Sequence, residues 1–185
     1  MENISSKQNQ FMNIYEDSHA SFVRYCKAKS YGIMDYEDLV RESILRAFEN
    51  FNKIRKKSSF HAYLYGIANN IIKYELRKKQ HSISENQFKL EYETISNNHA
   101  LNKFEIEVLY KALAQLPETQ KEAIILYEIS GYQLKEIARI QNAGLSAVKQ
   151  RIKRGREKLA AVLKNIEFNN EKSIKLSRIL MSLSL

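Results

Sequence analysis

The sequence predicts an all-α protein made of two small helical domains joined by a flexible linker. Apolar residues recur at spacings of three and four over several long segments, the period of helices with one buried face. The 185 residues include only 5 Gly and 1 Pro, fewer turn residues than an all-β domain needs. The 44% of hydrophobic residues is enough to form a core.

The expected domain boundaries follow this periodicity. Residues 1–80 form the first domain, 81–103 the linker, 104–165 the second domain and 166–185 the C-terminal tail. The linker is polar and lacks a sustained period, apart from a short helix near Asn86 to Thr94. The tail has the spacing of an amphipathic helix, which either docks on the protein or frays.

Three helices are expected in the first domain, over residues 11–29, 36–51 and 60–79. Gly32 ends the first helix, and Asp35 is placed to cap the second. Ser58 or Ser59 can cap the third, whose basic end suits the negative end of the helix dipole. Cys26, the only cysteine, lies among aromatic residues and is interpreted as a packed thiol.

Four helices are expected in the second domain, over residues 104–116, 118–130, 133–141 and 145–165. Pro117 stops the first of these and fits the start of the next. Gly131 suits the residue after a helix. Asn142 and Gly144 occupy a short turn, and both residue types tolerate left-handed backbone angles.

The net charge of +9 and pI of about 9.5 favour an anionic partner: nucleic acid, an acidic protein or an anionic membrane surface. The alternative is that the charges serve only solubility. The polar N-terminus lacks the apolar core of a signal peptide, and no stretch reaches about 18 apolar residues. A cytoplasmic location is therefore expected.

The last two helices of the second domain form a candidate helix–turn–helix, which places its second helix in the major groove of DNA. Leu145, Val148, Ile152 and Leu159 are expected to form the inner face of that second helix. Its other side is basic: Lys149, Lys153 and Arg156 share a stripe, Gln150 and Arg154 form a neighbouring row, and Arg151 and Lys158 suit phosphates. A helix face with charges of almost one sign favours a polyanionic binding partner. The alternative is that these two helices form an ordinary helical hairpin.

The first domain has a second basic face, in which Tyr63, Tyr65 and Tyr74 alternate with lysines and arginines. Aromatic residues near cations suit unstacked bases and single-stranded backbone. The alternative is that the aromatic residues belong to the hydrophobic core.

Two blocks of the sequence resemble the extracytoplasmic-function (ECF) group of the sigma-70 superfamily. The block DYEDLVRESILRAFENFNKIRKKSSFHAYLYGIANNIIKYELRKKQ resembles sigma region 2. The block LPETQKEAIILYEISGYQLKEIARIQNAGLSAVKQRIKRGREKL resembles region 4. Together they cover most of residues 11–165 in the order that the family has.

The resemblance implies a sigma factor that binds core RNA polymerase, recognises and melts promoter DNA, and initiates transcription. Binding to the clamp helices of the largest subunit is implied for Asp38, Leu39, Val40, Arg41 and Glu42, and region 4 is expected at the flap. Contact with the −10 element is implied for Lys56, Ser58, Ser59, Tyr63, Asn70, Lys73 and Arg77. Contact with the −35 element is implied for Ser146, Lys149, Gln150, Arg151, Lys153 and Arg154. An anti-sigma factor is a further expected partner.

The sequence departs from the family pattern at three positions, and a fourth position is one where members vary. Tyr63 stands where Trp is usual, and Tyr127 stands where some members have an arginine that contacts phosphate. Asn142 occupies a position where glycine is usual. Position 153, a lysine here, varies in the family, so the −35 sequence preference cannot be transferred.

Two other classes of function remain as alternatives. A helix–turn–helix regulator acting without polymerase would explain the second domain but leave the first block without a role. An enzyme is not expected, because the four histidines lack metal-ligand spacing and no phosphate loop or nucleophile motif is present. No cofactor, metal or small-molecule substrate is expected.

Overall fold

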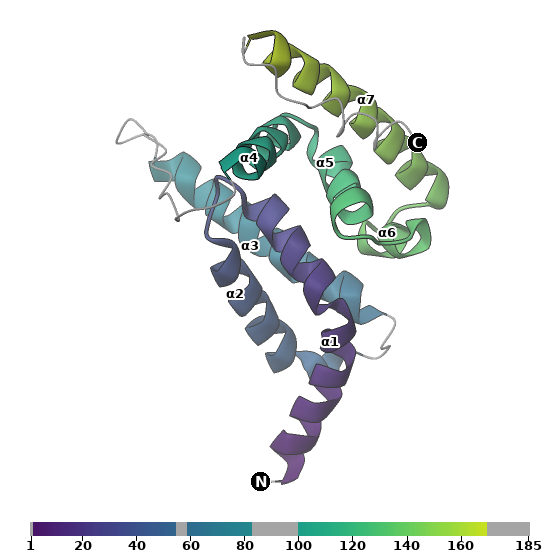
Figure 1. Cartoon of the computed structure of the whole chain (residues 1–185). Helices are drawn as coiled ribbons and strands as arrows, with labels where there is room; N and C mark the ends of the chain where they lie inside the picture. Colours follow the sequence, from purple (N-terminus) through teal and green to yellow (C-terminus); the bar gives the residue numbers. More distant parts are fainter. Residues whose placement is uncertain (1, 55–58, 83–99, 170–185) are drawn as a thin grey trace.

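The computed structural model describes residues 2–54, 59–82 and 100–169, and within these ranges the regular structure is entirely helical (Figure 1). The α-helices are α1 (Glu2–Ser30), α2 (Tyr36–Glu49), α3 (Phe60–Ser82), α4 (Ala100–Ala114), α5 (Glu118–Ile124), α6 (Leu134–Ile140) and α7 (Leu145–Asn169). A 3-10 turn (Phe51–Lys53) follows α2, and a π-helical segment (Ile125–Ile129) follows α5. The all-α class is confirmed. None of the helices described is both long and apolar enough to cross a membrane.

Helices α1, α2 and α3 pack together at one end of the molecule, shown at the bottom of Figure 1. Phe11 anchors this group, because its ring meets Phe48, Phe51 and Phe60 edge-on at centroid distances of 5.4, 5.4 and 5.5 Å. Cys26 is fully buried, as predicted, and burial raises the pKa of its thiol. It is therefore a packing residue.

The boundaries in this half follow local capping chemistry. The Asp35 carboxylate accepts hydrogen bonds from the backbone N–H groups of Glu37 and Asp38 at 2.6 and 3.4 Å, which confirms the predicted cap. Gly32 adopts a left-handed φ of 71° in the turn after α1. The predicted start of α1 at residue 11 is wrong, since the helix begins at Glu2. Lys7 supports this extra length by lying over the Phe48 ring, 4.4 Å from its centroid.

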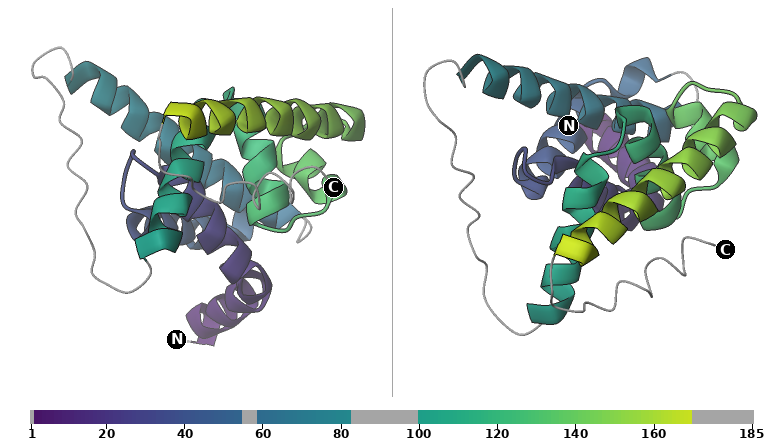
Figure 2. Two further views of the ribbon diagram at one scale, coloured as in Figure 1. Left: turned by 45° about the horizontal axis from the view of Figure 1, so that its top comes forward. Right: turned by 90° about the horizontal axis from the view of Figure 1, so that it is seen from above.

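Helices α4 to α7 form the other half, with α7 on the side of the molecule away from α2 (Figure 2). The predicted helix over 118–130 is divided, because its last turns widen into the π-helical segment. Gly131 then ends it with a φ of 80°, as predicted. Gly155 lets α7 approach α5 closely: a Cβ there would lie 2.8 Å from Cγ1 of Ile124.

The predicted linker over 81–103 is partly helical, since α3 continues to Ser82 and α4 begins at Ala100. The predicted helix near Asn86 to Thr94 and the tail helix lie outside the described residues. So does the candidate cap Ser58.

The two halves also pack directly on one another and share one continuous hydrophobic core. Helix α1 contacts the π-helical segment, and α3 contacts α6. Tyr132 bridges the halves, with its ring 5.4 Å from that of Tyr65 and 6.2 Å from that of His61. The Lys29 ammonium, only 1% exposed, forms an ion pair with Glu118 across this boundary. Nothing in the sequence predicted this contact.

Two glycine-to-alanine substitutions are expected to have opposite effects on stability. Gly155→Ala forces Ile124 to move and should lower the free energy of unfolding by about 1–3 kcal/mol, despite the better helix propensity of alanine. Gly66→Ala adds a Cβ where nothing lies within 4 Å, and should raise the free energy of unfolding by about 0.5–1 kcal/mol. Urea denaturation measures both, and equal effects of the two substitutions would contradict the close approach at Gly155.

Replacing Glu118 with glutamine is expected to destabilise the protein in a pH-dependent way. Burial raises the pKa of Glu118, but Lys29, Lys121 and Lys73 outweigh it, so the pKa is lowered overall. The ionised carboxylate therefore stabilises the fold above its ordinary pKa, and this contribution is lost as the pH falls through the lowered pKa. Glu118→Gln should cost about 1–3 kcal/mol at pH 7, because it leaves buried Lys29 without its ion pair.

The difference between Glu118→Gln and the unchanged protein should shrink as the pH falls below the ordinary range of a glutamate, measured by urea denaturation. Glu107→Gln is the control, because Glu107 pairs with Lys111 on the solvent-facing side of one helix at 2.6 Å. Such surface pairs contribute only about 0.3–0.5 kcal/mol. A constant difference at all pH values would contradict the role given to the carboxylate charge.

Candidate functional site

Helices α6 and α7 form a helix–turn–helix unit, and local hydrogen bonds hold both the start of α6 and the turn between the helices. At the start of α6, the Gln133 backbone N–H donates to Glu136 Oε2 at 2.9 Å. In the turn, the Ala143 N–H donates to the Ala138 carbonyl at 2.9 Å. Asn142 takes the predicted left-handed conformation with a φ of 45°, whereas Gly144 does not.

One stripe of α7 is buried against the rest of this half. Val148, Ile152 and Leu159 are 0%, 5% and 1% exposed, as predicted for the inner face. The prediction for Leu145 is wrong, because its side chain is 43% exposed. Leu145 is the first residue of α7, and helical side chains point toward the N-terminus, so it points past the end of the helix.

The opposite side of α7 is exposed and basic. It carries five of the six residues predicted to contact the −35 element: Ser146, Lys149, Gln150, Lys153 and Arg154. Within the part of the chain that the structure describes, no ion pair neutralises Lys149, Lys153 or Arg154. These cations are therefore available to a polyanion.

Two further arginines of α7 are already engaged within the protein. Arg151, the sixth predicted −35 residue, is half-buried and donates from Nη1 to Gln141 Oε1 at 2.9 Å. Arg156 forms an ion pair with Glu128 at 2.6 Å and lies over the ring of Tyr127, 5.5 Å from its centroid. Its spacing suggested membership of the cationic stripe, but its charge is paired.

Helix α3 presents a second exposed face. Tyr63, Asn70 and Arg77 follow one another at seven residues, so they lie along one side of the helix, with Lys73 beside them. All four are exposed, as is Ser59 just before the helix. Lys56 and Ser58 lie outside the described residues. Tyr65, which sequence spacing grouped with this basic face, is instead 0% exposed and belongs to the core.

Helix α2 separates the five residues predicted to bind polymerase into two sets. Asp38, Arg41 and Glu42 lie at the surface, where Arg41 donates to Asp38 at 3.0 Å. Leu39 and Val40 are 0% and 9% exposed and pack into the core. Because Leu39 and Val40 are buried in this structure, a partner cannot contact them directly. Their side chains position α2 instead.

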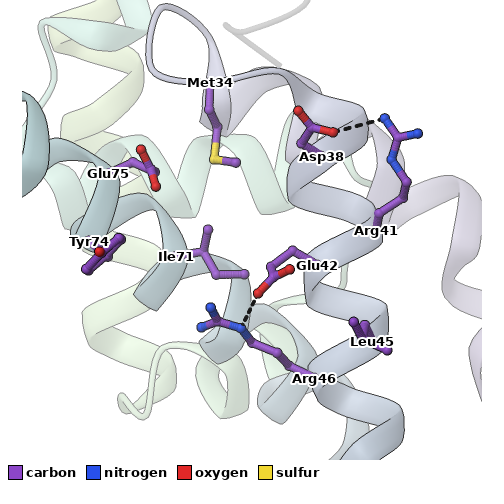
Figure 3. Close-up of a pocket in the computed structure, with 9 residues that line it drawn as sticks. All are labelled: Met34, Asp38, Arg41, Glu42, Leu45, Arg46, Ile71, Tyr74 and Glu75. Carbon is purple, nitrogen blue, oxygen red and sulfur yellow. Dashed lines mark hydrogen bonds and ion pairs between the residues drawn. The ribbon is translucent and has the colours of Figure 1, made fainter.

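The exposed side of α2 borders an open hollow shared with α3 (Figure 3). Leu45, 53% exposed, and Tyr74, 62% exposed, line it together with the ion pair between Arg46 and Glu42 at 2.6 Å. Sequence reasoning left Leu45 out of the site. Its position seven residues after Asp38, on the same side of the helix, is the pattern that could have found it.

The chain matches two family models in the same order. The model described as Sigma-70 region 2 matches residues 14–82, and the model described as Sigma-70, region 4 matches residues 106–159. The chain is 31% identical over 127 residues to the ECF RNA polymerase sigma factor EcfG of Rhodopseudomonas palustris, covering 69% of this chain and 70% of the relative. It is 28% identical over 135 residues to the ECF RNA polymerase sigma-E factor of Escherichia coli K12, covering 66% and 71%.

Two solved structures have a fold similar to that of this chain. The sigma factor RpoE in a complex with the anti-sigma factor NepR from Bartonella quintana has a TM-score of 0.64 and 23% identity, covering 85% of this chain and 96% of that one. CnrH in complex with the cytosolic domain of CnrY has a TM-score of 0.63 and 22% identity, covering 88% and 92%. Both share the arrangement of helices. With the two family matches and the identity to EcfG, the chain belongs to the ECF sigma factors of the sigma-70 family, which direct transcription initiation.

Proposed function

We propose that this sigma factor divides promoter recognition among three of its surfaces. The exposed face of α7 reads the −35 element as duplex DNA. The exposed face of α3, with the residues before it, holds the −10 element as it melts. The hollow between α2 and α3 docks on core RNA polymerase.

The observation that carries this proposal is the cationic face of α7, which forms no ion pair with the other residues that the structure describes. Lys149 and Lys153 lie one helical turn apart with Arg154 beside Lys153, and all three are exposed. Arginine and lysine donate to guanine edges, and glutamine such as Gln150 pairs with adenine. Because the other side of α7 is buried, this is the face that can enter a major groove.

The face of α3 suits separated strands. Tyr63 and Tyr74 offer exposed rings on which a base can stack, and Lys73 and Arg77 supply charge for the backbone. Extruding a base costs a few kcal/mol, so a site that stabilises the flipped base must recover that energy. Asn70 is exposed on the same side and has both a donor and an acceptor for a base edge.

The hollow beside α2 suits a protein partner. An exposed leucine and tyrosine among charged side chains form an apolar centre with a polar rim, which is the usual composition of a protein interface. Four of its five charged side chains are paired with one another, Arg41 with Asp38 and Arg46 with Glu42, which leaves Glu75 as the charge without an ion pair among the described residues when the surface is covered.

Three further features belong to the proposal. The chain acts as a regulatory subunit with no catalysis of its own, and it works in the cytoplasm. An anti-sigma factor restrains it, a proposal supported by the two similar structures whose titles name complexes with NepR and CnrY. A regulator acting without polymerase is not favoured, because it gives residues 14–82 no role.

Neutralising Lys149, Lys153 and Arg154 together to alanine is expected to abolish promoter-directed initiation. Each lost phosphate contact should reduce the salt dependence of DNA binding by about 0.9 in log–log slope, and each lost base contact should cost about 1–3 kcal/mol. The measurements are fluorescence anisotropy of a labelled duplex over a salt series and in vitro transcription with core polymerase from mapped start sites.

The matched control replaces Lys27, Lys111 and Lys164 with alanine, which removes the same charge from exposed positions away from the start of α7. This control should keep most of its DNA binding and transcription. Equal losses in both triple variants would show that only net charge matters.

Changing Arg41 and Leu45 together to glutamate is expected to weaken binding to core polymerase at least about ten-fold, because it places unpaired charge in the centre of the docking surface. Co-purification and a fluorescence titration with core enzyme provide the measurement. Met12→Glu is the control, since Met12 is a comparably exposed apolar residue on α1. Undiminished binding by the double variant, with an unchanged melting curve, would remove α2 from the interface.

A further inference from the structure

Gly66 lies in the interior of α3, on the side of the helix that faces away from the core. The core side is marked by Leu64, Ala68 and Ile71, which are 0%, 0% and 5% exposed. At about 3.6 residues per turn, Gly66 lies opposite that stripe. Glycine is among the least favourable residues inside a helix, because it loses the most backbone freedom when it is ordered. A glycine at this position therefore needs a physical reason.

Neither the backbone nor the packing of the described residues supplies that reason. Gly32 and Gly131 have left-handed φ angles of 71° and 80°, whereas the φ of Gly66 is not positive. Gly155 allows a close approach between helices, whereas a Cβ added at Gly66 would meet nothing within 4 Å. Alanine would thus fit the fold at this position and stabilise the helix. The reason that remains is close contact with a molecule outside the chain, which is a common use of glycine.

Asn70, four residues later, is a second weak helix former that the fold does not require. Its neighbour Asn69 has an internal role, since its amide donates to Glu122 and its Oδ1 atom accepts from the Tyr25 hydroxyl at 2.8 Å. Asn70 is exposed, and among the described residues its side chain has no hydrogen-bond partner. Residues four apart are neighbours on a helix, and helical side chains lean toward the N-terminus, so the Asn70 amide leans toward Gly66.

We call the open surface over Gly66, between Tyr63 and Asn70, the glycine gap. Tyr63, three residues before Gly66, is 36% exposed and offers a ring on which a base can stack. The Asn70 amide offers both a donor and an acceptor for a base edge. Lys73 and Arg77 follow on the same side of the helix and suit the phosphates of a strand that continues along it. The gap therefore has the chemistry of a nucleotide site.

A protein partner fits the glycine gap less well. Protein interfaces have an apolar centre, and the centre of this surface is bare backbone with an amide and cations around it. Base pairing also hides the edges of the bases from Asn70 in duplex DNA, whereas an unpaired nucleotide presents both its ring face and its pairing edge. The chemistry of the gap thus favours an unpaired nucleotide over a protein segment or a duplex.

We propose that an unpaired nucleotide of the melted promoter lies directly against the backbone of α3 at Gly66, in the glycine gap. This inference rests on the proposed function of α3 and adds a contact that depends on the absence of a side chain. Carbon atoms in contact lie about 3.5–4.0 Å apart. A Cβ would extend about 1.5 Å from the helix backbone, so even one methyl group displaces the nucleotide by a similar distance.

The proposal requires Gly66→Ala to change stability and DNA binding in opposite directions. The test uses holoenzyme assembled from core polymerase and the full-length chain, on a promoter located by mapping start sites in vitro. Affinity is measured by fluorescence anisotropy for two labelled templates, one fully paired and one with the −10 segment held unpaired by mismatches. Urea denaturation of the free chain measures stability, and a titration with core enzyme measures assembly.

Gly66→Ala should raise the urea midpoint and leave core binding and affinity for the paired template unchanged. Its affinity for the unpaired template should fall at least about five-fold, the low end of what one stacked base contributes. Gly66→Leu, which adds a larger side chain of good helix propensity, should lower that affinity further. Asn13→Ala is the matched control, because it replaces an exposed weak helix former on α1 and should stabilise the chain without changing DNA binding.

The double variant Lys73→Ala with Arg77→Ala separates the two proposals. If it weakens binding to the unpaired template while Gly66→Ala binds as tightly as the unchanged protein, the glycine contact is overturned and the role of α3 stands. If both variants keep full affinity, the proposed function of α3 falls together with the glycine contact. Equal losses in Gly66→Ala and Asn13→Ala, equal losses on both templates, or a loss of core binding would each overturn the glycine contact as well.

Discussion

The burial of one stripe of α7 against α5 is the constraint on which the rest of the second half depends. Val148, Ile152 and Leu159 are nearly inaccessible, and Gly155 brings the helix axes close enough that a single methyl group would meet Ile124. A helix held so closely on one side has one orientation, and its opposite side must face solvent. The nearby acid Glu128 forms its ion pair with Arg156, so it does not neutralise the outward-facing cations.

Fixing this helix matters because a recognition surface has to be rigid to be specific. A bidentate contact with a base edge requires the donor to arrive at a defined position in the groove. In the proposed −35 contact, the turn at Asn142 and the buried stripe set that position before DNA is bound. In that proposal, the long lysine and arginine side chains supply the remaining adjustment.

The boundary between the halves combines two kinds of interaction with different roles. The rings of Tyr65 and Tyr132 contribute apolar burial, which is strong but weakly directional. The hydrogen bonds of Asn69 and Glu122 require particular partners at particular distances. Polar pairs of this kind add little net stability, yet an alternative packing that left them unpaired would be costly. The boundary is therefore specific and still separable.

The two exposed surfaces of the first half lie side by side and carry different kinds of side chain. The hollow between α2 and α3 combines Leu45 with charged side chains of which four form two ion pairs, whereas the neighbouring face of α3 carries Lys73 and Arg77. An apolar centre with neutralised charges suits a protein, and unpaired cations suit a phosphate backbone. Tyr74 borders the hollow and is 62% exposed, so it stands between the two surfaces.

Local features were predictable because they depend on residues near one another in the chain. The Asp35 cap, the glycine at 131, the left-handed Asn142 and the buried stripe from Val148 onward all follow from short-range backbone chemistry and helical periodicity. The all-α class and the sigma-factor family also followed from the sequence, through its apolar spacing and two motif blocks. The start of α1 was missed because a polar segment carries no apolar period, although Lys7 can still pack on Phe48.

The sequence by itself therefore determined the class, the family and the residue types of the candidate surfaces. Only the tertiary structure decided which of those residues are available. Leu39 and Val40 turned inward, Arg156 became paired, and Tyr25, Asn69 and Glu122 met across the two halves. The physical reason is that exposure and pairing depend on neighbours far away in the chain, which helical spacing cannot identify.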